Sequence, residues 1–151
     1  MAAVGPPSPI EIRAARAKDI PALARLAGEL GYPTGEAEMR RRFDRVAEDP
    51  EHAALVAETG SGEVVGWVHV HLTRWLATPT RGELAGLIVA ATARNQGIGA
   101  RLLRAAEEWT KAHGGAVLSL RSNVVRKDAH RFYERAGYAV TKTSLNFRKT
   151  L

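Results

Sequence analysis

A short glycine-containing segment, residues 94–99 (RNQGIG), joins an apolar run to an expected helix. Its two glycines let a ligand approach the backbone, and the unpaired N–H groups at a helix N-terminus attract anions. Arg94 adds a charge-assisted hydrogen-bond donor. The segment therefore predicts a site for a phosphate or pyrophosphate group. Gly97 and Gly99 also suit a tight turn that binds nothing, so this pattern alone leaves both interpretations open.

Two other phosphate-binding patterns do not occur at this turn. The segment lacks the GxxxxGK[ST] sequence of a P-loop. The position three residues after Gly99 is Leu102, so the dinucleotide-binding GxGxxG is incomplete. The sequence therefore supports neither a nucleoside triphosphatase nor a dinucleotide-dependent enzyme.

A second distinctive segment consists of Ser122-Asn123 followed by residues 129–138 (AHRFYERAGY). Together with the RxxGxG turn after a strand ending at Val89, it resembles the two motifs of the GNAT superfamily of N-acetyltransferases. The resemblance extends over the order of elements from about Ile10 to Leu151. It implies an α/β fold with a central mixed, mainly antiparallel sheet of about six to seven strands. This sheet would splay between its fourth and fifth strands and be flanked by four helices.

The resemblance implies acetyl-CoA as the cosubstrate. Pantetheine would pair with the strand at residues 83–89, in the opening toward the strand at residues 116–121, and the pyrophosphate would bind the amides of the glycine turn. Two residues of the second motif would also line the cofactor. The implied cofactor-binding residues are Leu87, Ile88, Val89, Arg94, Asn95, Gln96, Gly97, Ile98, Gly99, Ala100, Asn123 and Phe132.

The implied reaction is direct attack of a primary amine on the thioester in a ternary complex. The amine is protonated at neutral pH and must first lose a proton, while the leaving thiolate gains one. Tyr133 matches the family's general acid, and the ordinary pKa of a tyrosine, about 10, suits protonation of a thiolate. Glu83 matches the base of histone-type relatives and would act directly or through a water. A solvated carboxylate paired with Arg81 is the alternative interpretation of Glu83.

Four residues are candidates for the acceptor side. His69 and His71 alternate with apolar residues, so both imidazoles leave the same face of a strand. They could relay protons, although simple hydrogen-bonded histidines fit the pattern as well. Because two histidines without a third ligand make no metal site, no metal is expected. In the family the acceptor pocket is built near Glu29 and Tyr32, which could hold a cationic amine or serve only as helix-end and loop contacts.

The spacing of the second motif bears on the acceptor class. Ten residues separate Asn123 from Tyr133, and the chain ends in FRKTL at residues 147–151. Both features resemble members that acetylate small-molecule amines, such as the aminoalkylphosphonate N-acetyltransferases. The resemblance therefore implies a small-molecule amine as acceptor. The alternatives are a protein or peptide N-acetyltransferase and a non-catalytic CoA-sensing or nucleic-acid-binding domain.

Hydrophobic periodicity predicts the elements that must position these groups. Asp19 is expected to cap a helix that ends at Gly31, and Thr34 a second helix that extends to Glu48. Two further helices are expected, one after the glycine turn and one at residues 128–136. Strands are expected at residues 9–13, 52–58, 63–72, 83–89 and 116–120, and as two final strands within residues 138–149.

Composition limits the classes of protein. With 151 residues, 45% of them hydrophobic, the chain fits one domain, expected here as residues 10–151 after a flexible arm at residues 1–9. The absence of cysteine excludes a disulfide framework and an acyl-cysteine intermediate. No signal peptide or membrane-spanning run is recognisable, so we expect a cytoplasmic protein with no membrane partner.

The net charge of +6 favours an anionic ligand. The most basic segment is interleaved with acidic residues, as is typical of a solvated helix face, so nucleic acid is not the expected partner. Its arginines are Arg40, Arg41, Arg42 and Arg45. The family resemblance further implies a homodimer.

Overall fold

The computed structural model describes residues 9–151, so the arm expected at residues 1–9 lies outside the described part except for Pro9. Two compact units are found, one ending at Leu120 and the other spanning Arg121–Leu151. In chain order the elements are β1 (Ile10–Ala14), the short 3₁₀ turn η1 (Ala17–Asp19), α1 (Ile20–Leu30), α2 (Glu36–Glu48), β2 (His52–Thr59), β3 (Val64–Thr73), β4 (Arg81–Val89), the 3₁₀ turn η2 (Ala91–Ala93), α3 (Ile98–Ala112), β5 (Leu118–Leu120) and α4 (Lys127–Arg135).

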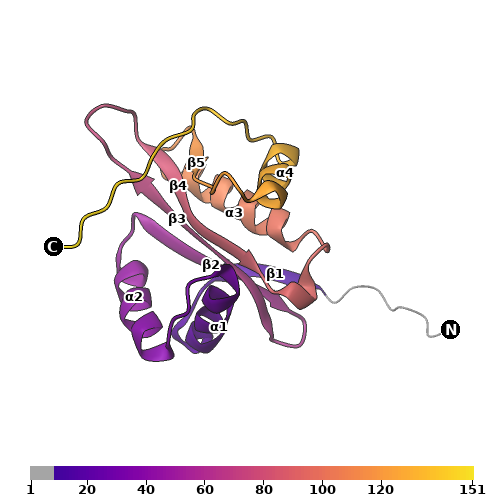
Figure 1. Cartoon of the computed structure of the whole chain (residues 1–151). Coiled ribbons are helices and arrows are strands. Elements are labelled where there is room, and N and C mark those ends of the chain that lie inside the picture. Colours follow the sequence, from indigo (N-terminus) through magenta and orange to yellow (C-terminus); the bar gives the residue numbers. More distant parts are fainter. Residues whose placement is uncertain (1–8) are drawn as a thin grey trace. The chain divides into compact units, whose positions relative to one another are not determined.

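The first unit is built on a mixed sheet in the order β1-β2-β3-β4-β5 (Figure 1). Strands β1 to β4 pair antiparallel, each with the next along the chain, and β5 pairs parallel to β4. The parallel pairing follows from the crossover through α3, since a parallel neighbour needs a long connection. The four helices and the mainly antiparallel sheet are as expected from the sequence.

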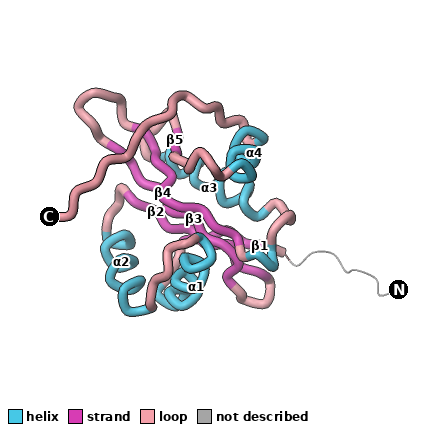
Figure 2. Tube along the Cα trace, viewed as in Figure 1, coloured by secondary structure: helices cyan, strands magenta, loops and turns pink. Residues whose placement is uncertain are grey.

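Helices cover both faces of this sheet (Figure 2). Helices α1 and α2 lie on one face and α3 on the other. A Cβ at Gly86 would clash with the ring of Trp67 and approach Leu30 of α1, whereas a Cβ at Gly66 would approach Leu102 of α3. The fully buried side chains fill the two layers between sheet and helices, and include Ile20, Leu26, Val56, Val68, Val70, Ile98, Leu102 and Leu103.

The pairing between the fourth and fifth strands is short. Pairing of β4 with β5 is confined to Gly82–Leu84 against Leu118–Leu120. Farther along β4, Leu87–Val89 pairs with β3 but has no strand partner on the β5 side among residues 9–151. Strand β5 itself ends at Leu120, so β4 has a backbone edge without a strand partner on that side just before the glycine turn. The splay expected from the sequence stays a prediction.

The expected number of strands was wrong, because the sheet has five strands in the described residues rather than six to seven. No strand follows α4 within residues 9–151, although two were expected at residues 138–149. A strand needs backbone partners and a buried face. The apolar side chains of this segment bury no such face, since Val140, Leu145 and Phe147 are 78%, 80% and 91% exposed.

Two helix starts also differ from expectation. Helix α2 is capped by Gly35, because the hydroxyl of Thr34 donates instead to the carbonyl oxygen of Tyr32 at 2.8 Å. Asp19 occupies the N-cap position of α1 but makes no side-chain cap. Its carboxylate is held by the guanidinium of Arg13, at 2.8 and 2.9 Å, and by the backbone N–H of Arg16.

Arg13 ties three elements together. Its Nε donates to Glu58 on β2 at 2.8 Å, while its other nitrogens bind Asp19 at the start of α1. The side chains of Arg13 and Asp19 are only 7% and 3% exposed. Burial alone would raise the pKa of Asp19, but the hydrogen bonds from Arg13 and Arg16 outweigh it and hold that pKa below its usual value. The network thus fixes where α1 begins relative to the sheet.

Candidate active site

The glycine turn leads from the open edge of β4 into α3. Gly97 is the N-cap of this 15-residue helix with φ +75°, and Asn95 before it also has a positive φ of +62°. Arg94 folds back so that its Nε donates to the carbonyl oxygen of Val89 at 3.3 Å. The first N–H groups of a helix have no intrahelical acceptor, and they lie at the positive end of its dipole. The turn can therefore receive an anionic group.

Glycine is needed at position 97 for its backbone conformation rather than for space. An added Cβ would meet no heavy atom of residues 9–151 within 4 Å. A left-handed conformation costs an L-residue roughly 1–2 kcal/mol. The open space above Gly97 leaves the amides of the turn accessible to a ligand.

The side chains of the turn differ in accessibility. Arg94, Asn95 and Gln96 are exposed, so their side chains and amides are available to a ligand. Ile98 is 2% exposed and packs in the core. Its side chain anchors α3, and only its backbone remains for the cofactor-binding role expected of it. Gly99 and Ala100 continue the first turn and are partly accessible.

Glu83 lies on β4 with 8% of its surface exposed. In the strand register it stands opposite His71 on β3 and opposite Ser119 on β5. Residues directly opposite on neighbouring strands share a face, with Cβ atoms about 4.5–5.5 Å apart. Glu83 is therefore a buried carboxylate at a position where β4 still pairs with β5.

His69 and His71 belong to a cluster of three histidines. Its third member is His52, the first residue of β2, which stands opposite His71. The rings of His52 and His71 are stacked, with centroids 4.9 Å apart and an interplanar angle of 12°. Nδ1 of His52 lies 2.9 Å from Nε2 of His69 in a hydrogen bond. We call His52, His69 and His71 the histidine cluster.

Sequence reasoning missed His52. It lies 17 residues before His69, and only the register of the β2–β3 hairpin brings the two together. The expected hairpin at residues 60–62 gives no signal that could have found it, because counting back along both strands pairs position 52 with position 70. His52 stands opposite His71 only through the register shift between Ala57 and Glu58. Burial first, and then the neighbouring His52 and His71, lower the pKa of His69 to about 4.

Glu29 and Tyr32 lie at the end of α1. The carboxylate of Glu29 accepts a hydrogen bond from the backbone N–H of Ala91 at 3.1 Å and so links α1 to the segment after β4. Tyr32 is 70% exposed, and its backbone N–H donates to the carbonyl oxygen of Ala27. Glu29 has a structural contact, whereas the phenol of Tyr32 is accessible to a ligand.

The second unit carries the remaining predicted residues. Tyr133 and Phe132 are neighbours on α4 with their rings edge to face, 5.1 Å apart. Tyr138 packs edge-on against Tyr133 from the other side at 5.9 Å. Burial raises the pKa of Tyr133, and the charge of Arg126 only partly offsets this rise. The phenol therefore stays protonated beyond the usual range, as a general acid requires.

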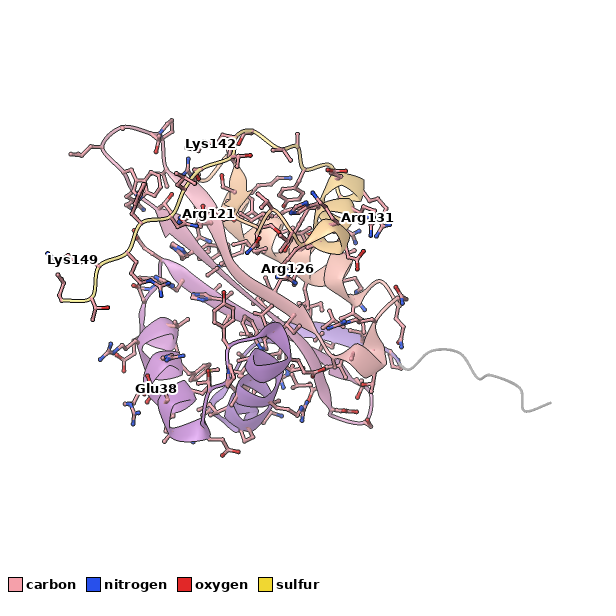
Figure 3. All side chains as sticks on the ribbon, viewed as in Figure 1. Glu38, Arg121, Arg126, Arg131, Lys142 and Lys149 are labelled. Carbon is pink, nitrogen blue, oxygen red and sulfur yellow. The ribbon has the colours of Figure 1, made fainter. Side chains whose placement is uncertain are left out.

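Asn123 stabilises the turn that precedes α4 through two hydrogen bonds. Its side-chain oxygen accepts the N–H of Val125 at 3.1 Å, and its carbonyl oxygen accepts Nε2–H of His130 at 2.9 Å. His130 thus ties α4 to the segment before it. The chain around Asn123 is basic, with Arg126 and Arg131 labelled in Figure 3. All of these residues belong to the second unit, Arg121–Leu151.

The basic segment on α2 is partly neutralised. Glu38, labelled in Figure 3, pairs with Arg41 and with Arg42, the latter at 3.1 Å between Nε and Oε1. All three side chains are well exposed. This arrangement fits the solvated helix face expected from the sequence.

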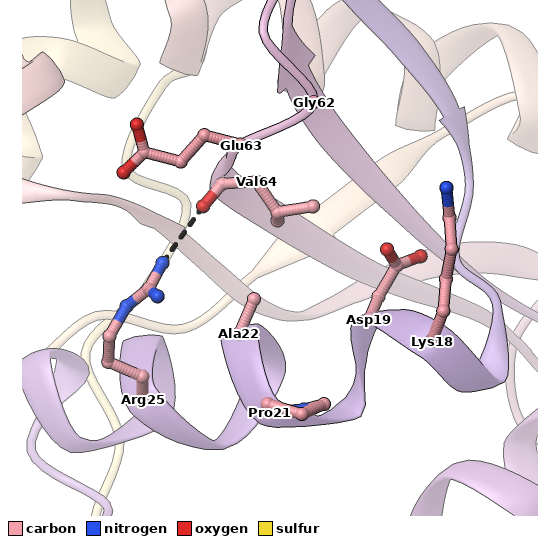
Figure 4. Close-up of a pocket in the computed structure, with 8 residues that line it drawn as sticks. All are labelled: Lys18, Asp19, Pro21, Ala22, Arg25, Gly62, Glu63 and Val64. Atoms are coloured by element: carbon pink, nitrogen blue, oxygen red, sulfur yellow. Dashed lines mark hydrogen bonds between the residues drawn. The ribbon is translucent and has the colours of Figure 1, made fainter.

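A separate hollow of about 280 Å³ lies at the start of α1 (Figure 4). Arg25 spans it and donates to the carbonyl oxygen of Val64 at 3.0 Å. Its lining contains none of the predicted site residues, and consists of Lys18, Asp19, Pro21, Ala22, Arg25, Gly62, Glu63 and Val64.

Within residues 9–151, no group of three histidine, cysteine or acidic side chains is arranged to hold a metal ion. The hydrogen bond between His52 and His69 uses ring nitrogens that a shared metal would need. None of the helices in this described part is long and apolar enough to cross a membrane.

Comparison with known proteins identifies the class. The model of the acetyltransferase (GNAT) family matches residues 20–138 of the chain, which covers both the glycine turn and the second motif. The chain therefore belongs to the GNAT family of N-acetyltransferases, as the two motifs indicated.

Curated relatives include enzymes with small-molecule acceptors in their names. An aminoalkylphosphonate N-acetyltransferase of Salmonella typhimurium is 38% identical over 97 residues, which are 60% of this chain and 58% of the relative. An aminoglycoside N(6')-acetyltransferase type 1 of Serratia marcescens is 30% identical over 125 residues, or 80% of this chain and 86% of the relative. The chain thus spans little more than half of the first relative and most of the second.

Solved structures share the fold. One of them is the aminoglycoside N-acetyltransferase AAC(6')-Iy in complex with CoA. It superposes with a TM-score of 0.87 at 15% identity, over 98% of this chain and 99% of that chain. At this identity the likeness shows the α/β fold with its mixed sheet and four helices.

Proposed function

We propose that this protein transfers the acetyl group of acetyl-CoA to a primary amine of a small molecule, by direct attack in a ternary complex. The observation that carries the proposal is the continuity of two features. On its β5 side, Leu87–Val89 of β4 lacks a strand partner in the described chain, and the accessible amides around Gly97 follow after the short turn η2. The pantetheine arm of acetyl-CoA is an extended chain with amide groups, and it is joined to a pyrophosphate. This order matches a strand edge that can pair with amides, followed by an anion site.

In this proposal the backbone at Leu87, Ile88 and Val89 pairs with pantetheine. The amides from Asn95 to Ala100 bind the pyrophosphate at the positive end of α3. The guanidinium of Arg94 contributes a positive charge. Asn123 and Phe132 line the cofactor from the second unit.

Two residues handle the protons of the reaction. Glu83 removes a proton from the ammonium group, directly or through a water, so that the amine nitrogen can attack the thioester carbonyl. Tyr133 gives a proton to the leaving thiolate. Its raised pKa supports this role, since the phenol remains protonated throughout the neutral range.

The small-molecule acceptor is supported by the names of the two curated relatives, an aminoalkylphosphonate and an aminoglycoside N-acetyltransferase. We propose that the acceptor binds on the α1–α2 face of the sheet. There Tyr32 is accessible, and His69 and His71 face the bound amine. Glu29 can still attract a cationic amine through the carboxylate oxygen that does not accept the Ala91 amide.

We further propose that residues 10–151 form one N-acetyltransferase domain that acts in the cytoplasm as a homodimer, without nucleic acid. Sedimentation of the purified protein tests the oligomeric state. A monomer at micromolar concentration would refute the dimer.

The test of the function is a thiol-release assay with acetyl-CoA and a panel of amines. The panel contains aminoalkylphosphonates, aminoglycosides, polyamines and peptides with free N-termini. We expect turnover with at least one small amine. Turnover with peptides only would instead show a peptide N-acetyltransferase, and CoA binding without any turnover would show a non-catalytic domain.

A further inference from the structure

We infer that the imidazole of His71 receives the proton that the acceptor amine loses, and that His52 is the positioning residue that holds His71 for this task. The inference rests on the proposed acetyl transfer and deepens it. It starts from the position of the histidine cluster in the sheet.

The cluster lies in one row with the candidate base. His52, His71, Glu83 and Ser119 stand opposite one another on β2, β3, β4 and β5. His71 therefore lies between His52 and Glu83, on the same face of the sheet. The β4–β5 pairing ends one residue beyond this row, at Leu84–Leu120. The row therefore lies next to the part of the β4 edge proposed to bind pantetheine.

The tautomer of His71 follows from its hydrogen bond. Its Nδ1 lies 3.2 Å from the carbonyl oxygen of Leu72, and a carbonyl can only accept, so Nδ1 carries the hydrogen. The lone pair of the neutral ring is then on Nε2. A proton bound at Nε2 leaves the hydrogen bond to Leu72 intact, so the ring can take up a proton without turning.

His52 supports this ring in two ways. Its own ring is stacked on His71 and so limits the orientations that the His71 ring can adopt. It is itself fixed, because Nδ1 forms a hydrogen bond with Nε2 of His69. His69 is buried and stays neutral at physiological pH, so it can accept the hydrogen of His52.

The acids that face the cluster come from neighbouring elements. Asp49 follows α2 and lies beside His52, and Glu83 of β4 stands opposite His71. These two carboxylates are the acidic groups nearest to the cluster along the sheet. Glu51, next to His52, is paired with Arg74.

The proton balance closes without another reactant. One N–H bond of the ammonium group breaks, and its proton binds Nε2 of His71, directly or by way of Glu83. The amine lone pair then forms the C–N bond, the C–S bond breaks, and the thiolate takes the phenol proton of Tyr133. The second nitrogen proton returns to Tyr133. His71 finally releases one proton to water, as the net reaction requires.

Three variants test the inference, with thiol release measured on an active amine. His71→Asn is expected to lower kcat about 100-fold, the lower range for loss of a proton-transfer group. His52→Ala is expected to lower kcat about tenfold with KM unchanged. His52→Phe keeps a ring on His71 and should recover kcat to within about twofold of the wild type.

The control is His113→Ala. This histidine is also stacked on an aromatic ring, that of Trp109, with centroids 4.2 Å apart, but it lies at the end of α3. Its kcat should equal that of the wild type. Thermal unfolding of each variant identifies any that fail to fold.

The pH profile of kcat provides a second measurement. Its acid limb reports the proton acceptor in the substrate complex. We expect this limb to change in His71→Asn. An acid limb that is the same in the wild type and in this variant would overturn the inference.

The two proposals fail in different ways. A wild type that releases no thiol with any amine overturns the proposed function and the inference with it. An active wild type whose kcat is unchanged in His71→Asn, or in which His52→Phe is as slow as His52→Ala, overturns the inference alone.

Discussion

Tyr133 shows how the environment of a single side chain fits it for its proposed chemistry. Its ring contacts two other aromatic rings, those of Phe132 and Tyr138. Burial disfavours the phenolate, so the pKa rises. The motif predicted this residue as a general acid, whereas its aromatic surroundings depend on the turn after α4.

Tyr133→Phe removes the phenolic proton and leaves the ring in place. We expect the rate of thiol release to fall about 100-fold, because a general acid contributes at least this much. The dissociation constant of acetyl-CoA should change by less than about twofold, as measured by isothermal titration. A variant that keeps the wild-type rate would remove Tyr133 from the mechanism.

The pH dependence of kcat follows from the direction of the Tyr133 shift. Only the protonated phenol can serve as acid, so activity is lost as pH rises through its pKa. Because that pKa is raised above 10, the basic limb attributable to Tyr133 should lie above pH 10. A Tyr133-dependent limb between pH 7 and 9 would contradict this prediction.

At the scale of elements, α3 is bounded by two glycines in the left-handed conformation. Gly97 caps its start with φ +75°, and Gly114 follows its end with φ +88°. At both positions an added Cβ would meet no heavy atom of the described residues within 4 Å. The two sites therefore impose the same backbone strain, but only Gly97 lies at the proposed anion site.

Substitutions at the two glycines separate strain from ligand binding. Gly97→Ala and Gly114→Ala should each lower the free energy of unfolding by about 1 kcal/mol, measured in urea. Gly97→Glu should weaken acetyl-CoA binding at least about tenfold by placing a carboxylate beside the pyrophosphate. Gly114→Glu should leave binding unchanged. Equal affinities for the two glutamate variants would refute the anion site.

The buried Arg13 network is the second test at this scale. Arg13→Met leaves the carboxylate of Asp19 buried without its main partner, which should cost about 3 kcal/mol of unfolding free energy. Arg41→Met breaks an exposed pair with Glu38, which solvent screens, so it should leave the free energy of unfolding almost unchanged. Chemical denaturation at pH 7 measures both. Equal losses would contradict the account of the network.

This network also predicts a loss of stability in acid. The pKa of Asp19 is lower in the folded protein than its usual value, so its contribution is present above about pH 4. That contribution is lost as pH falls through the folded pKa. Stability below pH 4 should therefore decline less steeply in Arg13→Met than in the wild type, measured by urea unfolding at several pH values.

Periodicity and turn residues predicted nearly all elements of the first unit, because their apolar faces are local in sequence. Two kinds of feature were not predictable. The strands expected at residues 138–149 have alternating residues but no backbone partner, and pairing is a non-local property. His52 joins the candidate site only through the register of a hairpin, and Asp19 leaves its capping role only because Arg13 lies beside it.

For the whole molecule, the net charge of +6 and the GNAT family assignment agree on an anionic cosubstrate. The motifs that define the proposed chemistry are divided between the unit ending at Leu120 and the unit from Arg121. Glu83 and the glycine turn belong to the first unit, and Asn123, Phe132 and Tyr133 to the second. The proposed reaction therefore requires both units to act as one domain.

If residues 10–151 form one domain, thermal unfolding should be a single cooperative transition seen equally by far-ultraviolet circular dichroism and by calorimetry. Acetyl-CoA at about 100 times its dissociation constant should add about 2.7 kcal/mol of stability. A separate early transition that is absent from a chain truncated after Leu120 would contradict the single domain.

The most direct test of the central claim is isothermal titration of acetyl-CoA into the wild type and Gly97→Glu. We predict binding to the wild type in the micromolar range and binding at least about tenfold weaker in the variant, since the cosubstrate's pyrophosphate would rest on this turn. No binding to the folded wild type at millimolar acetyl-CoA would contradict the proposed N-acetyltransferase function.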